Sequence, residues 1–142
     1  MHAPETAYEI VFPVAPEEID ELGHVNNVNY LRWVQEAATA HWRAAAPADE
    51  LERLVWVVLR HEIDYKTPAR LGDSIIARTW VGAATKLRFE RYVEIVRASD
   101  RRVLAQALTV WCPLDAKTLR PTAVSETVRT VFSRPVPVGS AS

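Results

Sequence analysis

The chain has 142 residues, of which 49% are hydrophobic and 25% are charged, and its formal net charge is −1. This composition is ordinary for one globular domain, the near-neutral charge argues against a nucleic-acid partner, and no apolar run is long enough to span a membrane. One cysteine excludes an intrachain disulfide framework, and four scattered glycines exclude a dinucleotide-binding fingerprint, a phosphate loop and a nucleophile elbow.

The first predicted element is a short strand that contains Tyr8, Ile10 and Phe12 and ends at Pro13. After a polar loop, a long helix is predicted from Tyr30 to Ala46, with apolar residues recurring on one face at Leu31, Val34, Ala38, Trp42 and Ala45. Asn27 or Asn29 is a suitable N-cap for this helix. Pro47 then breaks the helix, because proline cannot continue it.

From residue 54 onward the hydrophobic period changes from 3.6 to 2, which predicts strands over 54–66, 74–81, 87–95 and 103–113. In the first of these strands one face is expected to carry Val55, Val57, Leu59, His61, Ile63 and Tyr65. The turns between strands are short, so neighbouring strands should be antiparallel. Segment 122–132 has helical character, and the tail 133–142 should be loosely held.

These elements predict an α+β fold in which a five-stranded antiparallel sheet wraps around one long central helix. The whole chain, 1–142, is expected to be one domain with its core over about 8–132. The start of the chain has no signal-peptide pattern, so we expect a cytoplasmic protein.

The loop before the helix, 20–29, concentrates the polar side chains that could perform chemistry. Asp20 could act as a nucleophile or general base, although an aspartate in this position is often only a turn or cap residue. His24 could orient Asp20 or donate a proton, or it could be structural. The backbone N–H groups of Asn27 and Val28 at the helix start could stabilise an oxyanion.

Other polar residues are assigned structural roles or alternatives. Gly23 is expected either to adopt positive φ or to let substrate approach closely, and Asn29 to serve only as a turn or cap residue. Glu36 is a second carboxylate, for which we prefer a solvated or interface position, and His61 is interpreted as a core histidine. No metal site is predicted, because the four histidines lack ligand spacing with a carboxylate.

The string Asp20-x-x-Gly23-His24-Val25-Asn26-Asn27-x-x-Tyr30, set between a strand and a long helix, resembles the hotdog-fold thioesterases. Within them it is most similar to the 4-hydroxybenzoyl-CoA thioesterase-like branch, and the resemblance covers roughly residues 8–132. The string also resembles the acyl-carrier-protein thioesterases, but Leu22 stands where those enzymes carry an asparagine. This difference favours coenzyme A thioesters. Further similar segments are Ile63-Asp64-Tyr65, Pro68-Ala69, Gly72-Asp73, Leu114-Asp115 and Arg120-Pro121.

The resemblance implies hydrolysis of an acyl-CoA thioester in a homodimer, with two dimers associating further, and with no cofactor because CoA is part of the substrate. It places the catalytic carboxylate at Asp20, with His24 and Asn27 assisting. Contacts with substrate are then expected at Gly23, Asn26, Tyr30 and Trp33, and contacts with the CoA phosphates at Lys86, Arg88 and Arg91. The alternatives are an acyl-carrier-protein thioesterase, a hydratase or dehydratase of the same fold, and a non-catalytic acyl-CoA-binding domain.

Overall fold

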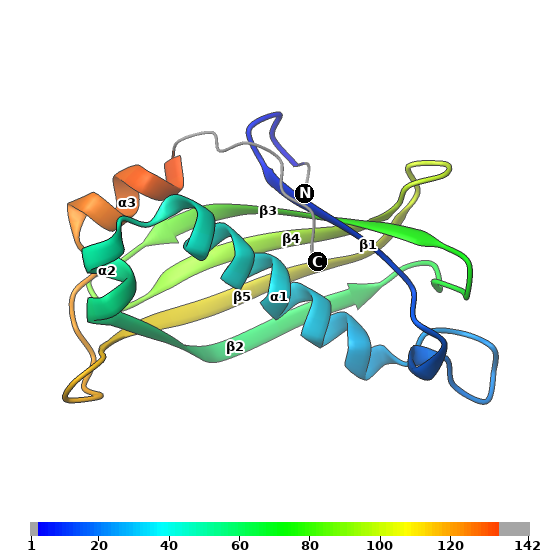
Figure 1. Ribbon diagram of the computed structural model, residues 1–142, viewed down its shortest axis with the longest axis horizontal. Helices are drawn as coiled ribbons and strands as arrows, with labels where there is room; N and C mark the ends of the chain where they lie inside the picture. The colour runs from blue at the N-terminus through cyan, green and yellow to red at the C-terminus, as the bar shows by residue number, and fades with distance from the viewer. Residues whose placement is uncertain (1–2, 134–142) are drawn as a thin grey trace.

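The computed structural model describes residues 3–133, in which one sheet curls around a long helix and two shorter helices lie at one end (Figure 1). In chain order the elements are β1 (Tyr8–Pro13), the 3-10 turn η1 (Pro16–Glu18), α1 (Asn27–Ala45), α2 (Ala48–Arg53), β2 (Leu54–Tyr65), β3 (Ser74–Ala84), β4 (Phe89–Arg97), β5 (Val103–Asp115) and α3 (Glu126–Ser133). Ser133 therefore ends a helix, and the rest of the predicted loose tail, 134–142, lies outside the described residues.

The sheet has the strand order β1-β3-β4-β5-β2, and every neighbouring pair is antiparallel. The predicted five-stranded antiparallel sheet around one long helix is confirmed. The two edge strands differ in length, since β1 has 6 residues and β2 has 12. Within residues 3–133, no helix is long and apolar enough to cross a membrane.

The helix α1 buries a wide stripe against the sheet, formed by Tyr30, Trp33, Val34, Ala37, Ala38, His41 and Trp42. The predicted face was partly wrong, because Leu31 and Ala45 are only half-buried. The helix also begins at Asn27, before the predicted start at Tyr30. A second short helix, α2, was not predicted; it starts directly after Pro47, where proline is tolerated because the first-turn N–H has no helical partner.

A β-bulge at Leu59 divides β2 into two halves. In the first half the even-numbered side chains point toward the core, and in the second half the odd-numbered ones do. Before the bulge, Trp56 and Val58 are the more buried side chains, whereas Val55 and Val57 are exposed. After it, His61 and Ile63 are the more buried ones. The prediction that one face carries apolar residues throughout 54–66 is therefore wrong, because a bulge inserts one residue and reverses the alternation.

A polar cluster formed by His41, Thr79 and Arg91 is enclosed between α1 and the sheet. Arg91 is only 4% exposed, and its Nη1 donates to His41 Nδ1 at 3.0 Å and to Thr79 Oγ1 at 2.9 Å. The His41 ring lies between Tyr8 and Phe132, at 5.1 and 5.0 Å between centroids. Burial, reinforced by the Arg91 charge, lowers the pKa of His41 to about 3, so His41 is neutral and accepts through Nδ1.

This cluster predicts acid sensitivity of the fold. The unfolded chain binds a proton at His41 below its ordinary pKa of about 6.5, whereas the folded chain does not bind it until about 3. Stability from this group is therefore complete above pH of about 6.5 and declines as pH falls toward about 3. Urea unfolding of the wild type and of His41→Asn between pH of about 7 and about 4.5 checks this. The variant should lose less stability over that interval, and equal losses would contradict the assignment.

Candidate functional site

A groove of about 420 Å³ opens at the N-terminal end of α1. Three segments meet there: the loop before α1, the first turn of α1, and the end of β2 with the turn that follows it. Its lining comprises Asp20, Leu22, His24, Val25, Asn26, Asn27, Tyr30, Tyr65, Lys66, Thr67 and Pro68. The fold thus brings together Asp20, His24, Asn26, Asn27 and Tyr30, as predicted from the loop sequence.

The Asp20 side chain both shapes the loop and faces the groove. Its Oδ1 accepts from the backbone N–H of Leu22 at 2.9 Å and of His24 at 3.3 Å. The turn closes through Gly23, whose N–H donates to the Asp20 carbonyl at 3.1 Å and whose φ of +78° suits glycine. Asp20 Oδ2 has no hydrogen bond within residues 3–133, so one carboxylate oxygen stays available to a ligand. Gly23 does not line the groove; the predicted substrate contact at this position is replaced by its role in the turn.

The helix start presents one free amide rather than the two predicted. Asn26, not Asn27 or Asn29, is the N-cap, and its Oδ1 accepts from Val28 N at 3.0 Å. The Val28 amide is therefore occupied, which corrects its predicted role as an oxyanion donor. The amide of Asn27 donates no hydrogen bond within the described residues. It sits at the positive end of the helix dipole and beside the groove.

Glu18, which sequence reasoning did not single out, fixes this loop to the helix. The residue is 3% exposed, and its Oε1 accepts from Ala15 N at 2.7 Å. Its Oε2 accepts from Trp33 Nε1 at 2.9 Å and also pairs with Arg32. No pattern distinguishes Glu18 from the exposed Glu17 beside it, because burial of one carboxylate arises from the tertiary fold.

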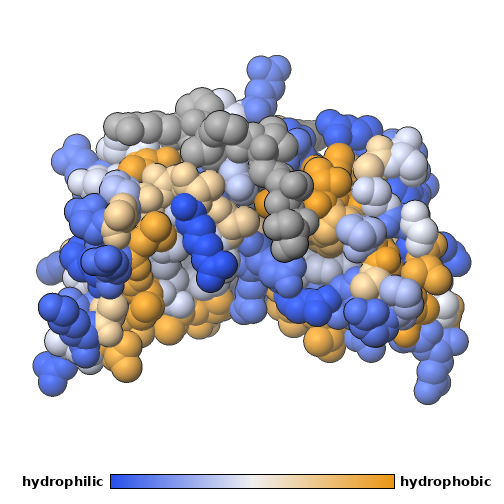
Figure 2. Space-filling model, viewed as in Figure 1, coloured by the Kyte–Doolittle hydropathy of each residue, from blue (hydrophilic) through white to orange (hydrophobic). Residues whose placement is uncertain are grey.

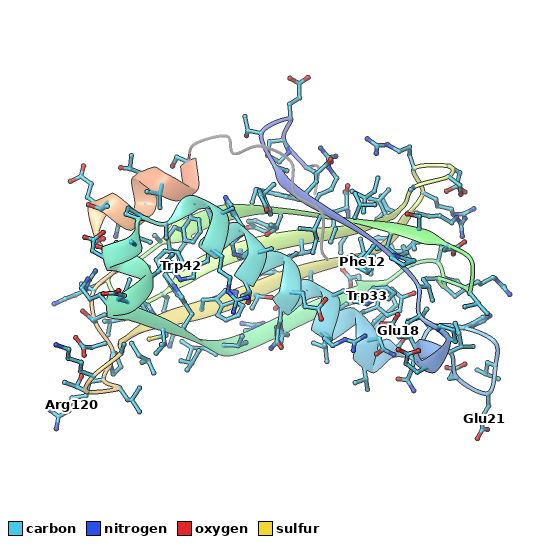
Figure 3. The ribbon with its side chains drawn as sticks, viewed as in Figure 1. Phe12, Glu18, Glu21, Trp33, Trp42 and Arg120 are labelled. Atoms are coloured by element: carbon cyan, nitrogen blue, oxygen red, sulfur yellow. The ribbon has the colours of Figure 1, made fainter. Side chains whose placement is uncertain are left out.

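The backbone of Glu18 also positions the residues at the helix start. Its carbonyl accepts from Asn26 N at 2.9 Å and from Asn29 Nδ2 at 3.2 Å. Trp33 is 1% exposed and packs on Phe12 and Tyr30, so it is a core residue and not the predicted substrate contact. Figure 3 shows Glu18 and Trp33 at the same end of α1, with Glu21 at the tip of the loop.

Two tyrosines form the opposite wall of the groove. The Tyr30 hydroxyl accepts from Ala69 N at 2.8 Å, and burial raises the pKa of Tyr30, so its own proton remains on the oxygen. The Tyr65 ring meets the Tyr30 ring edge-on at 5.4 Å, and its hydroxyl donates to the Asn27 carbonyl at 3.5 Å. Sequence reasoning missed Tyr65 as a site residue, because only the sheet's curvature brings the end of β2 to the helix start.

The predicted phosphate-binding cations are not at this groove. Arg91 is buried in the cluster with His41, where it cannot reach a dissolved phosphate, so that assignment is corrected. Lys86 and Arg88 are exposed in the turn between β3 and β4, at the α3 end of the molecule and away from the loop before α1 (Figure 1). The cation that lines the groove is Lys66, which the sequence did not suggest.

The remaining candidates have structural partners. His61 is half-buried and contacts Thr109 Oγ1 at 3.0 Å and Gln35 Nε2 at 3.4 Å, and burial lowers its pKa. Glu36 has an exposed carboxylate 3.7 Å from Arg32, as expected for a solvated position. Within residues 3–133, no group of three or more His, Cys, Asp or Glu side chains gathers in a way that could hold a metal ion.

Comparison with known proteins relates the chain to thioesterases. The family model described as "Thioesterase-like superfamily" matches residues 14–132. A palmitoyl-acyl carrier protein thioesterase, chloroplastic, from Gossypium hirsutum is 28% identical over 105 residues, which cover 68% of this chain and only 25% of that relative's length. The chain therefore spans about a quarter of the length of this curated relative.

Solved structures share the fold over most of the chain. The Dynemicin thioesterase has a TM-score of 0.80 at 21% identity, covering 93% of this chain and 99% of that one. A thioesterase from Thermus thermophilus, complexed with coenzyme A and Zn, has a TM-score of 0.77 at 24% identity, covering 92% and 97%. A 1,4-dihydroxy-2-naphthoyl-CoA thioesterase from Synechocystis has a TM-score of 0.76 at 18% identity, covering 89% and 96%. At these identities the likeness establishes the fold.

The Glu18 contacts predict that replacing Glu18 lowers the stability of the fold much more than replacing the neighbouring Glu17. Glu18→Ala should lower the free energy of unfolding by about 2–3 kcal/mol, because the buried Trp33 N–H and the partly buried Ala15 N–H lose their acceptor. Water can partly replace the pairing of Arg32, whose side chain is 53% exposed. Glu17→Ala, at an exposed position, should change stability by less than about 0.5 kcal/mol. Urea unfolding of both variants measures the difference, and equal effects would contradict the role of Glu18.

Proposed function

Since the chain belongs to the thioesterase-like superfamily, we propose that it hydrolyses an acyl-CoA thioester in the groove lined by Asp20. The observation that carries the proposal is that a carboxylate oxygen and a helix N-terminal amide, both without partners in the described residues, border one groove. The hotdog fold predicted from the loop and helix agrees with the solved thioesterases of the same fold. Action without a cofactor and a cytoplasmic location are parts of the same proposal.

The groove can supply the groups that thioester hydrolysis requires. The thioester carbonyl oxygen accepts from the Asn27 N–H, where the helix dipole stabilises the negative charge that develops on it. Such a donor typically contributes about 3 kcal/mol to the transition state. Asp20 Oδ2 then either removes a proton from the attacking water or attacks the carbonyl carbon itself, forming a mixed anhydride that water hydrolyses to release the acid and restore Asp20. When the C–S bond breaks, a proton goes to the departing thiolate, and the side chains proposed to donate it are His24 and Tyr30, which both line the groove.

The nature of the carrier is a second part of the proposal. Coenzyme A is favoured because Leu22 replaces the asparagine of carrier-protein enzymes, and because a solved relative from Thermus thermophilus is complexed with coenzyme A. Lys66 at the groove offers a cation for the carrier's phosphates. An acyl-carrier-protein substrate is the second candidate, favoured by the 28% identity to the plant enzyme. Thiol release from matched acyl-CoA and acyl-carrier-protein substrates separates the two.

The open edge of β2 supports a homodimer. This strand has 12 residues, no partner on its outer side within residues 3–133, and exposed apolar side chains at Val55, Val57 and Leu59. Figure 2 shows hydrophobic side chains gathered along the lower margin of the molecule, where Figure 1 places β2. A long, apolar, unpaired edge tends to pair with another strand. We propose that two copies pair through β2, and that two such dimers associate further.

Antiparallel pairing of β2 with its copy would also explain why Lys86 and Arg88 lie far from the groove of their own protomer. The β2 residues near Tyr65 in one protomer would then lie opposite the residues near Leu54 in the second. The groove of one copy thereby approaches the α3 end of the other, where Lys86 and Arg88 are exposed. These two side chains remain candidates for binding CoA phosphates across the dimer.

The proposed role of Asp20 predicts a loss of activity without a loss of structure. Asp20→Asn keeps the oxygen that accepts from Leu22 and His24 but cannot act as a base, so kcat/KM for acyl-CoA should fall at least about 100-fold. Thiol release measures the activity and thermal unfolding measures the fold. Glu21→Gln, in the same loop but outside the groove, should retain wild-type activity. An Asp20→Asn variant as active as the wild type would remove the assigned role.

The proposed dimer predicts that charge on the β2 edge dissociates the protein. In the double variant Val57→Lys and Leu59→Lys, charged side chains replace exposed apolar ones on the unpaired edge and would lose their water on pairing, so sedimentation equilibrium should show a shift toward monomer. Leu71→Lys replaces another exposed leucine, in the turn after β2, and should leave the association unchanged. A double variant that associates as strongly as the wild type would exclude β2 as the interface.

A further inference from the structure

Two hollows lie where α1 meets β2, one toward each end of the helix. The groove at the N-terminal end is bordered by Asn27 of α1 and Tyr65 of β2, and the Tyr65 hydroxyl donates to the Asn27 carbonyl at 3.5 Å. The other hollow is a cavity of about 50 Å³, bordered by Trp42 of α1 and Trp56 of β2, whose rings meet edge-on at 5.5 Å between centroids. We refer to the space between these two elements as the α1–β2 seam.

The walls of the cavity are mainly apolar. The rings of Phe89 and Phe132, from β4 and α3, stand beside the two tryptophans. Two charged residues, Glu90 and Arg91, also belong to the lining, and the Arg91 guanidinium is bound within the buried polar cluster described above. A water molecule occupies about 30 Å³ of liquid volume, so the cavity takes a short segment of a hydrocarbon chain and not a whole acyl group.

The contact between Gln35 and His61 crosses the seam between the groove and the cavity. Gln35 Nε2 on α1 lies 3.4 Å from His61 Nε2 on β2. The α1 backbone packs chiefly against β1, β3 and β4, so its separation from β2 is spanned by long side chains such as these. In α1, Gln35 lies between Asn27 of the groove and Trp42 of the cavity, so the contact separates the two hollows.

The two partners in this contact are held with different firmness. An amide nitrogen can only donate, so His61 accepts through Nε2, and the hydrogen on its Nδ1 points to Thr109 Oγ1 at 3.0 Å. Thr109 is 0% exposed, so the His61 ring is fixed to the sheet. Gln35 is exposed, and its distance of 3.4 Å is longer than an ordinary hydrogen bond. The contact can therefore open by movement of the Gln35 side chain.

Between the groove and this contact, the seam is apolar. Leu31 lies one helical turn before Gln35, on the same side of α1, and is half-buried. Ile63 is also half-buried, and it lies on the same face of β2 as His61 because strand residues two apart share a face. A hydrocarbon chain that leaves the groove along the seam therefore passes apolar side chains first and then meets the polar pair of Gln35 and His61.

We propose that the contact between Gln35 and His61 limits the length of the acyl group and closes off the aromatic cavity beyond it. This inference rests on the proposed thioesterase function, and it assigns the chain-length specificity of that site to residues of one protomer. The helix rise places Gln35 about 12 Å beyond Asn27, and an extended chain advances about 1.2 Å per bond, so the acyl group has room for roughly ten bonds. A longer chain must separate the two polar side chains and press against them.

The test measures thiol release from straight-chain saturated acyl-CoAs that range from short to long. Wild-type kcat/KM should fall at least about tenfold for chains just beyond the limit. Gln35→Ala removes the contact from the side of α1 and suits a helix, and His61→Ala removes it from the side of β2. Both variants should keep wild-type activity on short chains. Both should accept chains about four carbons longer, because Ala38, which lines the cavity, lies about 4.5 Å beyond Gln35.

The matched control is Glu36→Ala, at the neighbouring exposed position of α1. The Glu36 carboxylate lies 3.7 Å from Arg32 on the helix itself, so this variant should keep the wild-type length limit. The double variant Gln35→Ala and His61→Ala should shift the limit no further than Gln35→Ala does, because both changes open one contact. A wild type without a length limit, or a Gln35→Ala variant with the wild-type limit, would overturn the proposal.

A binding experiment separates this inference from the proposed function. Calorimetry measures the affinity of the wild type and of Gln35→Ala for free straight-chain carboxylic acids of the same range of lengths. If no acyl-CoA releases thiol, hydrolysis is excluded, but the length limit is still tested by these affinities. Tighter binding of long acids by Gln35→Ala than by the wild type, with equal binding of short acids, supports the limit at Gln35 and His61. Equal affinities of the two proteins across the whole series would reject it.

Discussion

The structure depends on one buried carboxylate. Glu18 accepts hydrogen bonds from Ala15 N and Trp33 Nε1, while its carbonyl accepts from Asn26 N and Asn29 Nδ2. These contacts hold the loop before α1 against the helix start, and they place Asn26 where its side chain caps Val28. The free Asn27 amide and the Asp20 carboxylate then border the same groove. A buried carboxylate is stable only when its oxygens are fully hydrogen-bonded, so the loop has one favourable geometry.

Local patterns predicted the fold and most of the residues that gather in the loop before α1. The change of hydrophobic period after residue 54 predicted the strands, and the polar string from Asp20 to Asn27 predicted which residues would gather at the helix start. The bulge at Leu59 could not be predicted from the alternation of apolar and polar residues, because residues 55–65 fit one uninterrupted alternation in the sequence. The N-cap of α1 was assigned to the wrong asparagine, because the side chains of all three asparagines can accept a hydrogen bond from a backbone N–H.

Residues that depend on tertiary packing were the ones that sequence reasoning missed or misplaced. In the sequence, Arg91 looks like one of several basic residues on a solvent-exposed strand face. Its position opposite Thr109 in the sheet instead directs its side chain inward, to His41 and Thr79. Trp33 has the helical position of a groove residue, but its indole N–H is bound by Glu18. Tyr65 and Lys66 reach the groove only because the sheet curls around α1. Burial, rather than residue type, decides whether such side chains are structural or functional.

The central claim is that the helix N-terminus at Asn27 holds the thioester carbonyl beside Asp20. A crystal structure with a non-hydrolysable acyl-CoA analogue tests it most directly. The account predicts the analogue's carbonyl oxygen within hydrogen-bonding distance of the Asn27 amide, about 2.7–3.1 Å, with a carboxylate oxygen of Asp20 facing the carbonyl carbon. An analogue bound with its carbonyl away from this amide, or outside the groove altogether, would contradict it.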